Sequence, residues 1–317
     1  PPALRTTLKL PTQQEALQTL HHPEASATEE LLSGHHPALQ RLACEELLAQ
    51  HLSLRELRLR HQAQKAPVVQ PEGRLATQML KALGFLLIAA QQRVLREINQ
   101  DLAQAFPMQR LVQGDVGCGK TVVAAAAALQ LVEAGYQVAL MAPTELLSEQ
   151  HFRNFQQWLA PLGVPCVLLL GKQRSSERKQ LEAQLAEDTP LVAIGTQALF
   201  QESVSFSRLG LIIIDEQHRF GVQQRLALRN KSQLEGLAPH QLVLTATPIP
   251  RSLAMTFYAD LDNSIIDELP PGRLPMETVA VPDSRRDEIV ARIRQACSDG
   301  RQVYWVCPLI EESEHFR

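Results

Sequence analysis

The sequence predicts an α/β fold in which a doubly wound parallel sheet carries helices on both faces and follows a helical segment. Residues 111–121 (LVQGDVGCGKT) read as a short apolar strand, a glycine-rich turn and the start of a helix. From there to Leu244, short apolar runs alternate with segments of helical periodicity, as parallel sheets with crossover helices require. The run 209–214 is continuously apolar, which is typical of a strand covered on both faces.

The composition is that of a globular protein with room for two domains. The chain has 317 residues, of which 45% are hydrophobic, and a net charge of −3. This charge argues against binding nucleic acid through global positive charge, although a local basic groove is compatible with it. The five cysteines include no C-x-x-C pair, so we expect neither a disulfide framework nor a zinc site. A reducing cytoplasm is therefore the expected setting.

No membrane-spanning segment is expected, because no run of about 18 apolar residues occurs. The first residues also lack the basic and apolar regions of a signal peptide. The chain does not start with Met, so we expect a trimmed or partial chain.

Residues 1–76 are expected to form a helical segment that links the rest of the chain to something upstream. Apolar residues recur at helical spacing over residues 38–59, which predicts one long helix. Residues 11–20 predict a shorter helix with Thr12 at its N-cap and Glu15 three residues later, a capping box.

Two other features of this segment have plain structural interpretations. The histidine pairs at 21–22 and 35–36 are expected at helix ends rather than in a metal site, because no i, i+4 histidine pair with a carboxylate supports a metal. Residues 62–71 contain two prolines and are interpreted as a linker.

The glycine-rich turn matches the phosphate-binding pattern G-x-x-x-x-G-K-[ST]. Glycines let the backbone turn its N–H groups toward a phosphate, and the following helix adds its positive N-terminal end. Lys120 is expected to reach the β- and γ-phosphates of ATP, and the Thr121 hydroxyl to ligate Mg²⁺. The alternative is a chance glycine turn before a helix. The expected nucleotide-binding residues of this turn are Gly114, Asp115, Val116, Gly117, Cys118, Gly119, Lys120 and Thr121.

A second acidic motif follows the apolar run 209–214. The strand would deliver Asp215 to the phosphates, where it can hold Mg²⁺ partly through water, and would place Glu216 to act as general base on the attacking water. The alternative is an acidic strand end that faces solvent. The two motifs together, about a hundred residues apart, predict a nucleoside-triphosphate-hydrolysing site in which Glu216, Lys120 and Asp215 are catalytic.

The remaining elements are predicted from periodicity, and Gly135 is expected to end the helix that follows the turn. Ligands of such sheets bind at the carboxyl ends of the strands. Predicted helices span 122–133, 144–159 and 175–187, and predicted strands span 137–142, 166–170, 191–194 and 241–244.

On these motifs the chain resembles superfamily 2 helicases, and more closely the bacterial RecG-type DNA helicases. The acidic motif is a DEQH box at 215–218 that continues as RFGVQQR, and the phosphate loop reads GDVGCGKTVVA from Gly114. Similar stretches occur at 141–145, 244–251, 269–273 and 304–313, so the resemblance covers most of the chain.

The resemblance implies a domain plan and further site residues. Residues 77–276 would be the first RecA-like ATP-binding domain, and 277–317 the start of a second, with strands at 277–281 and 302–307 around a helix at 285–297. Motif Ia (Pro143, Thr144, Glu145) and motif Ic (Gly195, Thr196) would touch the DNA backbone, and motif III (Thr245, Thr247) with His218 would couple the nucleotide to the DNA.

Several of these assignments have alternatives. Gln91 would bind the adenine edge, or else is a polar residue at a helix start. Without the resemblance, Thr245 and Thr247 would be taken as strand-end caps. Cys118 stands where the family often has Ser, and we expect it to leave an exposed thiol beside the phosphates. Ile88 and Gln197 also depart from the family pattern.

The resemblance implies an ATP-dependent DNA helicase or translocase that remodels branched DNA, through fork reversal and Holliday-junction migration in recombination and repair. Its partner would be branched double-stranded DNA, and the protein would be a monomer in the bacterial cytoplasm. One alternative is a translocase of the transcription–repair coupling type, and another is a nucleotide-binding scaffold without motor activity. Because the family's motifs V and VI are absent, this chain alone is expected to hydrolyse ATP poorly or not at all.

Overall fold

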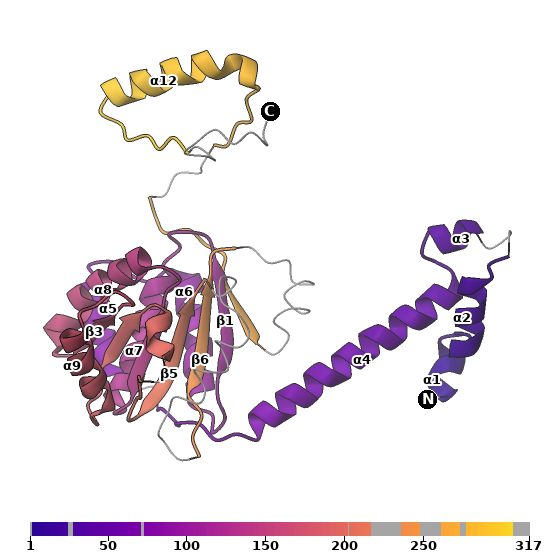
Figure 1. Ribbon diagram of the computed structural model, residues 1–317, viewed down its shortest axis with the longest axis horizontal. Helices are drawn as coiled ribbons and strands as arrows, with labels where there is room; N and C mark the ends of the chain where they lie inside the picture. Colours follow the sequence, from indigo (N-terminus) through magenta and orange to yellow (C-terminus); the bar gives the residue numbers. More distant parts are fainter. Residues whose placement is uncertain are drawn as a thin grey trace. The chain divides into compact units, whose positions relative to one another are not determined.

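A computed structural model describes residues 2–24, 28–70, 73–201, 203–216, 236–247, 261–272 and 277–306. The chain divides into two compact units, Pro1–Pro270 and Pro271–Arg317. The first contains the sheet and the N-terminal helices, and the described residues of the second contain the α-helix α12 (Figure 1).

A sheet of seven strands forms the centre of the first unit, and every pairing in it is parallel. The spatial order is β3-β4-β2-β5-β6-β1-β7, so the chain crosses over between most neighbouring strands. The predicted doubly wound sheet is thereby confirmed. The strands are β1 Gln109–Gly114, β2 Gln137–Met141, β3 Cys166–Leu169, β4 Val192–Gly195, β5 Leu209–Asp215, β6 His240–Thr245 and β7 Asp262–Ile266.

Helices cover both faces of this sheet because the strand residues alternate between two apolar cores. Val138 and Leu140 of β2 belong to one core, and Ala139 and Met141 to the other. The first core is covered by α5 Arg74–Ala82, α6 Ala89–Leu102, α7 Lys120–Glu133 and α8 Glu145–Leu159. The second is covered by α9 Ser175–Ala186 and the short helix η3 Gln197–Phe200.

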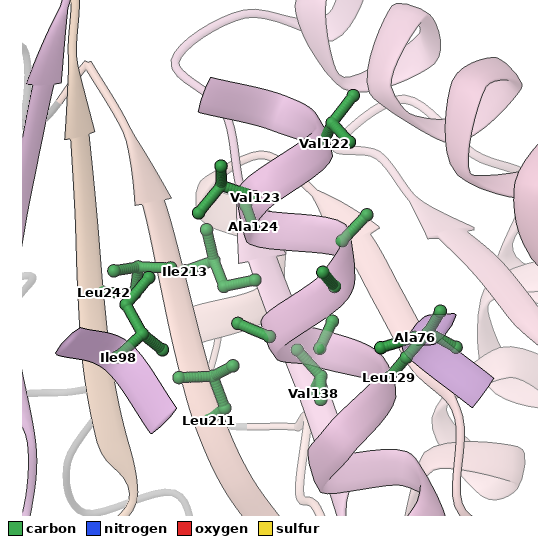
Figure 2. Close-up of a cluster of buried hydrophobic side chains, with 14 of the residues drawn as sticks. Ala76, Ile98, Val122, Val123, Ala124, Leu129, Val138, Leu211, Ile213 and Leu242 are labelled. Carbon is green, nitrogen blue, oxygen red and sulfur yellow. The ribbon is translucent and has the colours of Figure 1, made fainter. Parts of the chain in front are cut away.

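Helix α7 is the centre of the first core, and Figure 2 shows the side chains of the sheet and of α6 around it. Its residues from Val123 to Leu131 are almost completely buried, and five of them are consecutive alanines. Small side chains let the helix approach the sheet closely, as the sequence predicts. Gly135, with a φ of 85°, follows the end of α7 in the left-handed conformation that glycine favours.

The register of the strands brings their carboxyl ends to one edge. Gln113 of β1 lies opposite Thr245 of β6, and Asp215 of β5 lies opposite Leu244. On the other side of β5, Met141 of β2 pairs with Ile214 and also with Gly195 of β4. The predicted motifs that follow these strands therefore meet along a single edge of the sheet.

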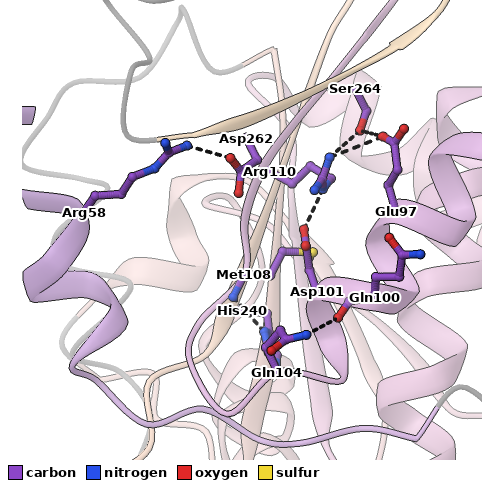
Figure 3. A network of polar contacts seen from close by, with 10 residues as sticks. All are labelled: Arg58, Glu97, Gln100, Asp101, Gln104, Met108, Arg110, His240, Asp262 and Ser264. Atoms are coloured by element: carbon purple, nitrogen blue, oxygen red, sulfur yellow. Dashed lines mark hydrogen bonds and ion pairs between the residues drawn. The ribbon is translucent and has the colours of Figure 1, made fainter. Parts of the chain in front are cut away.

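The strand β7 is not predicted from the sequence, because Asp262, Asn263 and Ser264 give it a polar start. A polar network holds it beside β1 (Figure 3). The Arg110 guanidinium donates to Asp101 at 2.6 Å and to the Ser264 hydroxyl at 2.7 Å, and Ser264 in turn donates to Glu97. The buried side chains of this edge strand are Ser264 and Ile266, which lie two residues apart and therefore on the same face.

The N-terminal residues form α1 Pro2–Thr7, α2 Gln13–His21, α3 Thr28–Leu32 and the long α4 Pro37–Gln62. The capping box at the start of α2 is confirmed, since Thr12 N donates to Glu15 Oε2 at 2.7 Å and Glu15 N donates to Thr12 Oγ1 at 3.2 Å. The single long helix is confirmed as α4. Several of its leucines, among them Leu47 and Leu59, are exposed in the chain as described.

Of the predicted linker 62–71, residue 62 still belongs to α4, and residues 63–70 form no helix but are held by backbone hydrogen bonds to the rest of the unit. Ala66 N donates to Ala105 O at 3.0 Å, and Val69 N donates to Leu102 O at 2.9 Å. His240, fully buried at the start of β6, joins this segment to β1. Its Nδ1 accepts from Met108 N at 2.9 Å, and its Nε2–H donates to Pro67 O at 2.7 Å.

The second unit contains the predicted helix, α12 Arg286–Ser298, preceded by the short turn η5 Asp283–Arg285. The strands predicted at 277–281 and 302–307 are wrong where the structure describes them, because residues 277–281 and 302–306 have no regular structure. A strand is stabilised by hydrogen bonds to a neighbouring strand, and the described part of this unit offers no such neighbour.

His240 gives the stability of the first unit a pH dependence. Burial lowers the pKa of its imidazole from 6.5 to about 4. Above pH 6.5 the ring is neutral in both states and its titration has no effect. As the pH falls from 6.5 toward 4, the unfolded chain binds a proton that the folded chain does not, and the free energy of unfolding drops by roughly 3 kcal/mol in total.

Urea unfolding of the chain and of His240→Gln between pH 4 and pH 8 measures this effect. The titration of carboxylates changes the unfolding free energy of both proteins equally and cancels in the difference between them. Only the wild-type chain loses stability through His240, so this difference should shrink as the pH falls below 6.5. Parallel curves would contradict a buried neutral His240.

Candidate functional site

The phosphate loop links β1 to α7 and is built around two glycines with positive φ. Gly117 has a φ of 77° and Gly119 a φ of 88°, a conformation that other residues adopt at a cost. A Cβ on Gly119 would lie 2.2 Å from the Gln91 side-chain nitrogen. Gly114 and Cys118 are buried, Gly119, Lys120 and Thr121 are half-buried, and Asp115, Val116 and Gly117 are exposed.

The N-terminus of α7, which begins at the end of this loop, has the hydrogen-bond donors that an anion requires. The first bonds to Gly119 O come from Val122 N and Val123 N, so the N–H groups of Lys120 and Thr121 precede the hydrogen-bonded turn and have no acceptor within the helix. Lys120 Nζ folds back onto Gly114 O at 2.6 Å and Asp115 O at 3.0 Å. An ammonium group, helix N–H groups and a hydroxyl at one place are the donor set that a nucleotide triphosphate with Mg²⁺ requires.

The acidic motif lies at the end of β5. Glu216, the first residue past the strand, has a φ of 53°, which is uncommon for a residue with a side chain and is typical of functional sites. Its carboxylate accepts from Ala246 N at 3.1 Å and from Thr245 Oγ1 at 3.5 Å. Thr247 N donates to Thr245 Oγ1 at 3.2 Å. The proposed general base is therefore held by the segment that follows β6.

One residue of the site was not predicted. His151 of α8 places its Nε2 2.7 Å from Asp215 Oδ2, and both side chains are largely buried. The sequence does carry a signal for it. Ser148, His151, Phe155 and Leu159 recur at helical spacing on the buried face of α8, and a histidine in such a stripe needs a polar partner.

The residues predicted to touch DNA lie at two neighbouring strand ends. Thr144 is the N-cap of α8, and its Oγ1 accepts from Leu147 N at 3.3 Å. Thr196 caps η3, and Gly195 ends β4 so close to β3 that a Cβ would lie 2.2 Å from Leu169 O. Ala142 N, just before Pro143, donates to Gly195 O at 2.9 Å and so joins the two segments.

Exposure differs among these residues, since Thr144 is exposed, Pro143, Glu145 and Thr196 are half-buried, and Gly195 is buried. His218, predicted to report on the γ-phosphate, lies outside the described residues, as does the rest of the motif from Gln217 onward.

Gln91 is buried, and both ends of its amide are engaged within the protein. Its oxygen accepts from Ile88 N at 3.1 Å, and its nitrogen donates to Cys118 O at 2.8 Å. In this arrangement Gln91 holds the phosphate loop. A contact with adenine stays a prediction that requires these two bonds to rearrange.

The expectation of an exposed thiol at Cys118 is wrong, because Cys118 is only 1% exposed. Its side chain turns inward beneath the loop, where its sulfur would lie 2.5 Å from a Cβ on Gly114. The loop, with its positive φ at Gly117 and Gly119, thus places this one side chain in the apolar core.

None of the described helices is long and apolar enough to cross a membrane.

Comparison with known proteins shows that this chain is similar to helicases. The family model for the DEAD/DEAH box helicase matches residues 88–256. The ATP-dependent DNA helicase RecG of Escherichia coli is 56% identical over 305 residues, which make up 96% of this chain and 44% of that protein. RecG of Aquifex aeolicus is 43% identical over 298 residues, or 94% of this chain and 37% of that protein.

A solved structure described as RecG bound to a three-way DNA junction superposes with a TM-score of 0.75 at 40% identity. The match covers 88% of this chain and 38% of that one. The chain thus spans less than half the length of the relatives that it matches.

The burial of Cys118 predicts the order in which the thiols react. Among the four cysteines that the structure describes, iodoacetamide should modify the exposed Cys297 first, while Cys118 and Cys166 react slowly in the folded chain. Burial raises the pKa of the Cys166 thiol to about 12, which further suppresses its thiolate. Peptide mass spectrometry over a time course, with urea-unfolded chain as control, measures the rates. Modification of Cys118 as fast as of Cys297 would contradict the inward orientation.

Proposed function

Since this chain belongs to the DEAD/DEAH box helicase family and is of the RecG type, we propose that it supplies the ATP-binding domain of an enzyme that remodels branched DNA. The observation that carries the proposal is the shared edge of the sheet. The phosphate loop, Asp215 and Glu216 lie along it with the segments 143–145 and 195–196.

The nucleotide chemistry follows from the residues at this edge. Lys120 would leave its carbonyl partners to bind the β- and γ-phosphates, and the N–H groups at the start of α7 would bind phosphate oxygens. Thr121 and Asp215 would hold Mg²⁺, which neutralises charge that develops on the phosphates. Glu216 would accept a proton from the attacking water, with its carboxylate oriented by Ala246 N.

The contacts with DNA would be independent of sequence, because they involve phosphates. The N-terminus of α8 at Thr144 offers N–H groups to a phosphate, and Gly195 and Thr196 lie beside it. Motif III would transmit the state of the nucleotide, since Thr245 and Ala246 already hold Glu216. The substrates would be forks and Holliday junctions, in recombination and repair.

The domain plan is part of this proposal. Residues 1–76 would be a helical segment, 77–276 the first RecA-like domain and 277–317 the start of the second. We propose a monomer in the bacterial cytoplasm. The relatives are RecG helicases, so the comparisons do not favour a translocase of the transcription–repair coupling type.

The general-base assignment predicts a separation of binding from hydrolysis. In the full-length protein, Glu216→Gln should lower DNA-stimulated ATP hydrolysis by about 100-fold or more while nucleotide binding persists. Lys120→Ala should weaken nucleotide binding itself. Steady-state hydrolysis and unwinding of a synthetic three-way junction measure both, with Glu149→Gln, an exposed carboxylate of α8, as the matched control.

Two outcomes would reject the proposal. Junction unwinding by Glu216→Gln at the wild-type rate would favour a nucleotide-binding scaffold over a motor. Equal stimulation by linear duplex and by the three-way junction would remove the preference for branched DNA.

A further inference from the structure

We propose that His151 is a positioning residue that orients the Asp215 carboxylate for Mg²⁺ and links it to the DNA-contacting end of α8. This inference rests on the proposed function, because it assumes that Asp215 serves a bound metal and that Thr144 lies beside DNA.

The first step is the contact itself. His151 Nε2 lies 2.7 Å from Asp215 Oδ2, and the side chains are 8% and 14% exposed. A carboxylate oxygen is the natural acceptor of this contact, so we assign the donating N–H to Nε2. The other nitrogen, Nδ1, is buried and has no hydrogen-bond partner among the described residues. The contact with Asp215 is therefore the polar interaction that fixes the ring.

The second step is the cost of a histidine at this position. The next two turns of the same face carry Phe155 and Leu159, both fully buried. An apolar residue at position 151 would fill the same core without leaving a buried nitrogen unpaired, which typically costs about 1–3 kcal/mol. Packing alone therefore does not account for His151, whereas a hydrogen bond to Asp215 does.

The third step is what this bond does at the metal site. A carboxylate at the end of a strand can rotate about its side-chain bonds, and a metal needs it in one orientation. The bond from His151 engages Oδ2 and leaves Oδ1 to face the metal or its bound water. Groups that hydrogen-bond a metal ligand in this way commonly change metal affinity by about 10–100-fold when they are removed.

The fourth step connects this carboxylate to the DNA side. Thr144 caps α8, Ser148 one turn later is fully buried and donates its hydroxyl to Thr144 O at 3.0 Å, and His151 follows in the second turn. These residues move as one rigid piece of helix about 10 Å long. A DNA phosphate that shifts the N-terminus of α8 would therefore shift the donor that orients Asp215.

The test uses substitutions that separate the effect of the hydrogen-bond donor at position 151 from the effect of side-chain volume. His151→Leu keeps most of the volume and removes the donor. His151→Gln places an amide nitrogen near the position of Nε2 and keeps it. Phe155→Leu, one turn further along the same buried face, is the matched control for damage to the packing of α8. Should His151→Leu fail to fold, His151→Asn, whose amide is one bond shorter than that of glutamine, replaces it.

The measurement is binding of a fluorescent ADP analogue to the full-length protein as a function of Mg²⁺ concentration, with and without a synthetic three-way junction. His151→Leu should raise the Mg²⁺ concentration for half-maximal binding by about tenfold or more. His151→Gln and Phe155→Leu should stay within about twofold of wild type, because both keep the donor. The junction should shift the Mg²⁺ dependence of wild type and not that of His151→Leu.

Two results would overturn the inference. One is a Mg²⁺ dependence of His151→Leu that coincides with wild type, and the other is an equal change in Phe155→Leu. Failure of the proposed function gives a different result, in which wild type itself shows no Mg²⁺-dependent nucleotide binding.

Discussion

The register of the parallel sheet is the constraint on which the rest of this structure depends. Strands buried on both faces leave no room for polar side chains except at their ends, and parallel pairing brings all carboxyl ends to one edge. The pairs Gln113–Thr245, Asp215–Leu244 and Met141–Gly195 therefore align segments that are far apart in the sequence. A slip of one residue in β5 would turn each of its side chains toward the opposite core and change the residue of β6 that lies opposite Asp215.

Several polar side chains at this edge already have partners within the protein. Lys120 bonds to the loop carbonyls, Gln91 to Cys118 O, and Glu216 to Ala246 N. Buried or half-buried polar groups are costly without partners, so these contacts stabilise the folded chain. A nucleotide must replace the contacts of Lys120, whereas those of Glu216 can persist because they orient the carboxylate rather than occupy the phosphate position.

The sequence predicted the parts of the fold that depend on local patterns and missed those that depend on partners. Apolar runs and the glycine spacing predicted β1, β2, β5 and α7, because the backbone preferences and burial of these elements follow from residues close together in the sequence. The edge strand β7 has a polar start, and its pairing with β1 and its contact with Arg110 are tertiary interactions that the sequence pattern does not contain. The segment 302–306 has a strand-like composition, but no strand pairs with it among the described residues. The inward turn of Cys118 and the bond from His151 arise from tertiary packing, which single-residue patterns do not contain.

Two adjacent residues at the end of β5 receive connections from different elements. Asp215 is held by His151 from α8, and Glu216 by Thr245 and Ala246 at the end of β6. The positive φ of Glu216 turns its backbone at this point, which lets the second carboxylate reach the β6 side. The proposed metal ligand and the proposed general base are therefore oriented by different elements, α8 for Asp215 and the end of β6 for Glu216.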